Sequence, residues 1–445
     1  MKCRYFFASF CRSLRRQALR WACCVALLRA GGSPVAAQTP GDMEVRLPVE
    51  NDWVFDAGHP IRFVPELIGH RAGGFGVVRM SLTSDFGDPI AAFVAAYAFG
   101  RDSLTDDGRF RSRAVFTLPP LRPGFYRAVL SVDADTLRDF CFAYEPERMT
   151  CRPDRPRDFG DFWRRTLAEL KRVDARFALL LLPERSVGGR RVYEVRMHSL
   201  GDEVLCGYWA VPEGVGRYPA VIVYSDYGAA ARIPGPDDYP GWGVLVLPPR
   251  GQGRYLSENR FGEWVAYGLD SPLDYYYRGA YADAVRGIDF VAAQAGFDGR
   301  NLFVTGVAQG GALALAAAAL DRRVSAAAPI MPTMADFPVC FRRVLWPASA
   351  VEVGARRQRV SLRHALAVLS YFDLQHLTGG IACPVSLGFG MQDDITLPRT
   401  QFSAYNPIRS RKRWVCFPES GHRSGEEERE RWAAENRRFF NAVLQ

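Results

Sequence analysis

The feature that most constrains this chain is a sharp strand-to-helix turn in its second half. The strand-like residues 301–305 run directly into Gly306-Val307-Ala308-Gln309-Gly310-Gly311, and an alanine-rich helix follows. Small residues flank such a turn because its central residue is strained and because strand and helix approach closely. The pattern is typical of a nucleophile elbow, whose central residue is normally serine. Here that residue is Ala308, which has no hydroxyl group to attack an acyl carbon.

Two further residues follow predicted strands. Asp393 comes just after an apolar strand ending at Gly390, and His422 comes just after the strand at 414–417. Nucleophile, acid and histidine in this order match an α/β-hydrolase triad, and ligands bind at the carboxyl ends of such strands. Taken singly, the turn at Ala308, the Asp393-Asp394 pair and the histidine could each be ordinary loop features. Their joint order favours the remnant of a triad.

Strands and helices alternate through residues 151–445. Apolar strands are predicted near 219–224, 244–248, 301–305, 326–331 and 384–389, and helices near 279–294, 309–320 and 425–443. A further helix is predicted to open at Asp158, with Phe159, Phe162 and Trp163 on one face. The alternation predicts an α/β fold with a mostly parallel, doubly wound sheet covered on both faces.

Residues 38–150 have a different pattern. Short strand-like runs such as 61–64 and 128–132 are separated by Gly, Pro and Asp clusters, and the turn at 119–126 introduces a strand. We therefore predict a small all-β, immunoglobulin-like sandwich domain. The proline-punctuated residues 152–157 predict a linker to the domain at 151–445.

The first 37 residues predict a secretory signal peptide. They carry seven Lys or Arg and no acid, then an apolar run at 21–28 and a small-residue stretch ending at Ala37. About eight apolar residues are too few to span a bilayer, so the mature protein is expected to be secreted or periplasmic, without a membrane span. The chain's formal charge of +9 falls to +2 without this segment, which argues against nucleic-acid binding. The scattered cysteines match no metal-ligand spacing.

Six short motifs occur in one order between about residue 156 and the C-terminus. They are Tyr224-Ser225-Asp226-Tyr227-Gly228, Arg250-Gly251-Gln252-Gly253, Tyr275-Tyr276-Tyr277-Arg278, Gln309-Gly310-Gly311, Leu369-Ser370-Tyr371-Phe372-Asp373 and residues 398–406. Together they resemble the motif set of carbohydrate esterase family seven, the acetyl xylan esterases and cephalosporin C deacetylases, which have the α/β-hydrolase fold. Several separated motifs in one order are far more specific than an elbow alone.

The resemblance implies an esterase that removes acetyl groups from xylo-oligosaccharides or related small acetyl esters, without metal or organic cofactor. By analogy, Asp393 would orient His422, the general base, and the backbone N–H groups of Tyr227 and Gln309 would form the oxyanion hole. Arg250 and Gln252 would support the site, unless they belong only to a glycine-rich surface loop. The family's ring-like homo-oligomers are also implied, although the added N-terminal domain would hinder that packing.

Three departures from the family pattern cluster at this site. Besides Ala308, the family's His-Glu pair is His422-Arg423, and its His-Gly before the oxyanion tyrosine is Ser225-Asp226. A negative Asp226 would oppose the charge that develops in an oxyanion hole. Impaired catalysis is therefore expected. The open alternatives are direct activation of water by His422, Ser225 as a displaced nucleophile, and a non-catalytic glycan-binding or regulatory protein.

Overall fold

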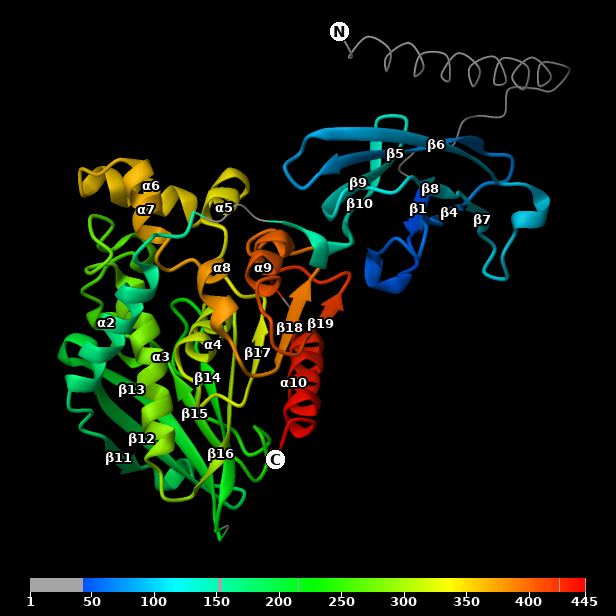
Figure 1. The fold of residues 1–445 in the computed structure, drawn as a ribbon. Coiled ribbons are helices and arrows are strands. Elements are labelled where there is room, and N and C mark those ends of the chain that lie inside the picture. Colours follow the sequence, from blue (N-terminus) through cyan, green and yellow to red (C-terminus); the bar gives the residue numbers. More distant parts are fainter. Residues whose placement is uncertain (1–42, 151–153, 215, 424, 445) are drawn as a thin grey trace, which may run out of the picture.

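A computed structural model describes residues 43–150, 154–214, 216–423 and 425–444. The predicted signal peptide, residues 1–37, lies outside these ranges. No helix in the described part of the chain has the length and apolar character needed to cross a membrane. The described residues form an all-β N-terminal part and a larger α/β part (Figure 1).

The N-terminal part contains three small sheets that share one apolar core. A five-stranded sheet has the order β2-β10-β9-β5-β6, beside the sheets β1-β4-β7 and β3-β8. Phe63, Leu130 and Phe140 are buried members of the shared core. The all-β character is as predicted, while the immunoglobulin-like topology stays a prediction. The strands are β1 Met43–Arg46, β2 Val54–Phe55, β3 Ile61–Phe63, β4 Glu66–Gly69, β5 Phe75–Ser84, β6 Pro89–Ala98, β7 Phe110–Arg113, β8 Phe116–Leu118, β9 Gly124–Val132 and β10 Asp135–Tyr144.

The α/β part is built on a nine-stranded sheet in the order β11-β12-β13-β15-β14-β16-β17-β18-β19. From β15 to β19 neighbouring strands are parallel, as expected, whereas β11, β12 and β13 add an antiparallel edge that the sequence did not reveal. The strands are β11 Ala178–Leu181, β12 Arg190–Ser199, β13 Glu203–Pro212, β14 Tyr218–Tyr224, β15 Gly243–Leu247, β16 Phe297–Val307, β17 Ala326–Ile330, β18 Val385–Gly390 and β19 Lys412–Phe417.

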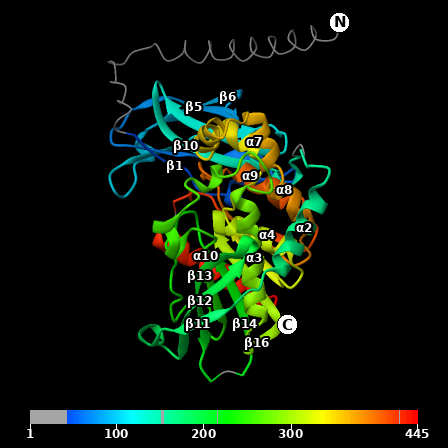
Figure 2. The same ribbon diagram turned by 90° about the vertical axis from the view of Figure 1, so that its left-hand side faces the viewer.

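Helices cover both faces of this sheet because successive strand residues point to opposite sides. Ile222 packs in the cluster that contains α3 and α4, whereas Val221 packs in the cluster that contains Phe440 of α10. In Figure 2, α2 and α3 lie to the right of the strands β11 to β13. The α-helices are α2 Phe159–Arg172, α3 Tyr276–Ala292, α4 Gln309–Leu320, α5 Phe337–Arg343, α6 Ala348–Arg357, α7 Leu362–Leu369, α8 Leu374–Leu377, α9 Pro398–Tyr405 and α10 Glu426–Asn441.

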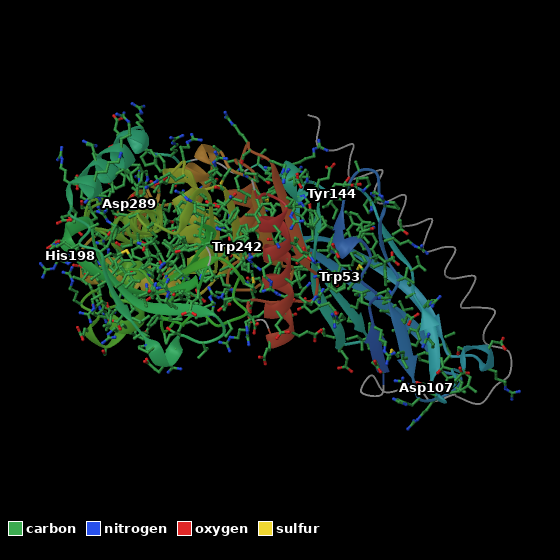
Figure 3. All side chains as sticks on the ribbon, turned by 90° about the horizontal axis from the view of Figure 1, so that it is seen from below. Trp53, Asp107, Tyr144, His198, Trp242 and Asp289 are labelled. Atoms are coloured by element: carbon green, nitrogen blue, oxygen red, sulfur yellow. The ribbon has the colours of Figure 1, made fainter. Side chains whose placement is uncertain are left out.

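The N-terminal part packs against the β18–β19 end of the large sheet, beside α9 (Figure 1). The rings of Phe125 and Phe402 lie 5.3 Å apart between centroids, and Arg399 Nη1 lies 2.9 Å from Asp85 Oδ2. Gln392 reaches across as well: its Oε1 accepts from Cys141 N at 2.7 Å, and its Nε2 donates to Cys141 O at 3.1 Å. Seen from below, Figure 3 places Tyr144 near this boundary and Asp107 at the far tip of the N-terminal part.

Candidate active site

The turn between β16 and α4 keeps the backbone of a nucleophile elbow. Ala308 has φ 48° and ψ −109°, a conformation rare for residues with a side chain, and it is 3% exposed. Such a residue stores strain of about 1–3 kcal/mol. A Cβ on Gly306 would lie 2.4 Å from the backbone of Gly310, and one on Gly310 would lie 2.2 Å from Tyr224 O. The glycines are therefore required by close approach, and the elbow persists without its hydroxyl.

Asp393 and His422 meet beside this turn. His422 Nδ1 lies 3.1 Å from Asp393 Oδ2, the geometry in which an acid orients an imidazole. The Asp393 carboxylate is held in turn: its Oδ1 accepts from Ile395 N at 3.0 Å and Thr396 N at 2.7 Å. The Thr396 hydroxyl donates to Asp393 Oδ2 and lies 3.3 Å from His422 Nδ1. The chain order predicted this meeting, but nothing in the sequence pointed to Thr396.

The two N–H groups predicted to form the oxyanion hole converge on one oxygen atom, and that atom belongs to the protein. Asp226 Oδ1 accepts from Tyr227 N at 2.6 Å and from Gln309 N at 3.2 Å. From the sequence, Asp226 was expected only to repel a nearby negative charge. In the structure its carboxylate oxygen occupies the point on which both of these N–H groups converge.

The local charges shift two pKa values in this site. Burial raises the pKa of Asp226, although its two N–H donors and the nearby His422 lower it in part. The hydrogen bond to Asp393 raises the pKa of His422, opposed by burial and assisted by the charges of Asp393, Asp226 and Asp394. The site therefore holds its proton on His422 more tightly than an isolated histidine would.

This shift predicts a pH-dependent effect of His422→Gln on thermal stability. The folded chain binds the His422 proton more tightly than the unfolded chain, whose histidine has a pKa near 6.5. His422 therefore stabilises the fold fully below that value, and the stabilisation is lost as pH rises through the higher folded-state pKa. We expect His422→Gln to lower Tm more at pH 5 than at pH 9, measured by calorimetry. In an Asp393→Asn background this difference should shrink, and an equal loss at both pH values would contradict the assignment.

Buried amide and tyrosine groups hold the two segments that supply these converging N–H groups in place. Gln252 Nε2 donates to Tyr276 Oη at 2.9 Å and to Gln309 Oε1 at 3.2 Å, while its Oε1 accepts from Gly228 N at 2.9 Å. Tyr277 Oη donates to Gln309 Oε1 at 2.9 Å. Gln252 thus touches both segments that supply the converging N–H groups, which is the geometry a supporting residue needs.

Arg250 forms a buried ion pair with Asp283 of α3. Arg250 Nε and backbone N lie 2.9 and 3.0 Å from Asp283 Oδ2, and Nη2 lies 2.6 Å from Oδ1. Asp283 is 1% exposed. A Cβ on Gly279 would come within 2.3 Å of the guanidinium. Asp283 was not identified from the sequence, although it is a lone acid on an otherwise buried helix face.

A cavity of about 350 Å³ opens over these groups. Ala308, His422, Asp226 and Gln309 line it together with Tyr227, Glu263, Val265, Tyr277, Thr333, Met334, Ala335, Phe337, Cys340, Trp346, Pro347, Ile395, Thr396 and Thr400. The Cys340 thiol is a poor substitute nucleophile, because burial and the acids Asp373 and Asp336 raise its pKa to about 12. Ser225 lines a different, neighbouring cavity. Within the described ranges, no group of three or more His, Cys, Asp or Glu could hold a metal ion.

Comparison with known proteins agrees with this geometry. The family model described as "Acetyl xylan esterase (AXE1)" matches residues 144–436, about two thirds of the chain. The chain belongs to the acetyl xylan esterase family. The matched segment contains the complete large sheet and every residue of the site described above.

Individual members of the acetyl xylan esterase family support the same assignment. The chain is 25% identical over 347 residues to the acetyl esterase Axe7A of Xylanibacter ruminicola, covering 74% of this chain and 78% of that one. The structure of an acetyl xylan esterase from Paenibacillus sp. R4 superposes with a TM-score of 0.61 at 25% identity, covering 67% of this chain and 98% of that one. Acetyl xylan esterase 1 from Thermoanaerobacterium sp. JW/SL YS485 shares the fold, with a TM-score of 0.61 at 22% identity and the same coverages. The large domain therefore has the α/β-hydrolase fold of this family.

Proposed function

We propose that this chain is an exported member of the acetyl xylan esterase family that holds an acetylated carbohydrate in the cavity around Ala308 and hydrolyses it slowly or not at all. Export rests on the predicted signal peptide at residues 1–37. The acetyl ligand follows from the family, whose members remove acetyl groups. Impaired hydrolysis follows from the chain's own residues.

The observation that carries the proposal is the position of Asp226. Its Oδ1 accepts both N–H groups, at 2.6 and 3.2 Å, that an ester hydrolase must keep free for the developing oxyanion. Loss of the serine hydroxyl alone costs on the order of 10⁶ in turnover in a serine hydrolase. Attack by a water that His422 activates would also create an oxyanion, so the same carboxylate opposes that route.

The proposal is tested by measuring binding and acetate release on the same samples. Titration calorimetry with acetylated xylo-oligosaccharides should give a Kd at least about tenfold lower than with the same oligosaccharides after chemical deacetylation. Acetate release from the acetylated form should stay close to the rate in buffer. Trp346 lines the cavity and the neighbouring Leu345 does not, so Trp346→Ala should weaken binding and Leu345→Ala should leave it unchanged.

Two results would overturn this function. Equal affinity for acetylated and deacetylated oligosaccharides would show that the cavity does not recognise the acetyl group. Rapid acetate release that disappears in His422→Ala would show that the chain is an active esterase without its serine.

A further inference from the structure

A second cavity shares Asp226 and His422 with the one just described. Its volume is about 610 Å³, larger than the 350 Å³ of the first, and Asp226 and His422 line both. Its floor includes Val223, Val246 and Thr305, whose side chains point to the α10 face of the sheet. The segment 225–242 between β14 and β15 contains no helix, so this part of the sheet is left with only α10 and a loop around it.

Four arginines surround this cavity. Arg232 comes from the loop after β14, Arg423 follows β19, and Arg429 and Arg437 come from α10. In contrast, the lining of the first cavity contains Asp226 and Glu263 and neither arginine nor lysine. The two cavities therefore differ in the sign of their charge, although they meet at the same two residues.

Part of this positive charge is not neutralised by the described residues. The acids that line the cavity are Asp238, which pairs with Arg232, and Asp226, whose Oδ1 is occupied by two N–H groups. Arg423 and Arg437 make no hydrogen bond or ion pair with any described residue. Arg423 stands where the family pattern has a glutamate, so this departure adds a positive charge to the cavity.

The α10 side of the cavity also offers neutral hydrogen-bonding groups. Arg429, Trp432, Ala433, Asn436 and Arg437 recur at the three- and four-residue spacings that place side chains on one face of a helix. Trp432 is 3% exposed, and its Nε1 has no hydrogen-bond acceptor among the described residues. A buried indole N–H without an acceptor is costly, which makes it a candidate donor to a ligand.

We propose that this second cavity binds the anionic group of a small ligand, a carboxylate or a phosphate. Arginine guanidinium groups present planar pairs of N–H donors that match carboxylate and phosphate oxygens, and several around one cavity raise affinity for such a group. The negative Asp226 places the anion toward α10 rather than toward Ala308. This site is separate from acetyl recognition and does not depend on it.

The test uses probes that carry no acetyl group. Titration calorimetry at low salt should detect binding of glucuronate or of inorganic phosphate, and no comparable binding of glucose. The double variant Arg423→Gln/Arg437→Gln should weaken binding of the anion by at least about tenfold. Arg356→Gln/Arg438→Gln is the matched control, because it removes the same charge from exposed helix positions outside the cavity, and it should bind as the parent does.

The two anions separate the possible sources of the ligand group. Binding of glucuronate but not phosphate would assign the cavity to a sugar acid, and the reverse would assign it to a phosphorylated ligand. Failure of both anions to bind more tightly than glucose would overturn the proposal. An equal loss in the control double variant would also overturn it, since it would reveal only general attraction to a positive surface.

Discussion

The double variant Ala308→Ser/Asp226→Gly is expected to release acetate from 4-nitrophenyl acetate at least about 10²- to 10³-fold faster than Ala308→Ser alone. A serine at 308 would regain a nucleophile beside His422, which Asp393 already holds at 3.1 Å. In the single variant the Asp226 carboxylate would still occupy both converging N–H groups. Losing one oxyanion donor costs about 10²- to 10³-fold in kcat, so blocking two should cost at least as much.

Two control variants distinguish the effect of the negative charge of Asp226 from the effect of its oxygen occupying the two N–H groups. Ala308→Ser/Asp226→Asn removes the charge but keeps an oxygen that can accept the same N–H groups, so it should remain slow. Adding His422→Ala to the fast double variant should return it to the background rate. If Ala308→Ser alone already matches the double variant, Asp226 moves aside easily and does not obstruct catalysis.

The variant Arg250→Met should lower the free energy of unfolding by about 3–5 kcal/mol, because it leaves the buried Asp283 carboxylate without its partner. The side chains are only 10% and 1% exposed, so water cannot replace the lost contacts. Urea unfolding followed by tryptophan fluorescence measures the change. Removing both charges in Arg250→Met/Asp283→Leu should recover much of the loss, since the cost arises mainly from an unpaired buried charge.

A surface ion pair supplies the comparison for this prediction. Arg164 and Asp161 on α2 also form an ion pair, but their side chains are 78% and 58% exposed. Arg164→Met should therefore change the free energy of unfolding by less than about 1 kcal/mol. A similarly small effect of Arg250→Met would mean that the Arg250–Asp283 pair does not support the fold around the site.

The sequence predicted those elements whose pattern is local. The strands at 219–224, 244–248 and 326–331 and the helix at 309–320 lie close to their predicted positions, because each is a short apolar run between clear turn signals. The antiparallel edge β11–β13 was missed, since β12 and β13 mix polar and apolar residues and precede the regular alternation. The short helices α5 to α8, between β17 and β18, and α9, between β18 and β19, carry too little helical periodicity to predict.

At the site, the sequence identified the types and the chain order of the residues but not the orientation of their side chains. It predicted that Asp393 and His422 would each lie at the carboxyl end of a strand, because each directly follows an apolar strand-like run. It could not show that Asp226 turns its carboxylate onto Tyr227 N and Gln309 N, since that depends on side-chain rotation. The Arg250–Asp283 pair joins positions 33 residues apart and likewise needs the folded chain.

The contact made by Gln392 means that the α/β part of this protein should depend on its own N-terminal part and should not tolerate its replacement by another domain. Its amide bonds to the backbone of Cys141 in the N-terminal part, and the next residue is Asp393. If the α/β part were fused to a different domain or expressed by itself, the Gln392 side chain would lose these two hydrogen bonds. The loss would occur next to Asp393, whose carboxylate contacts His422. Any chimera made from this chain must therefore carry the Cys141 strand along with the pocket.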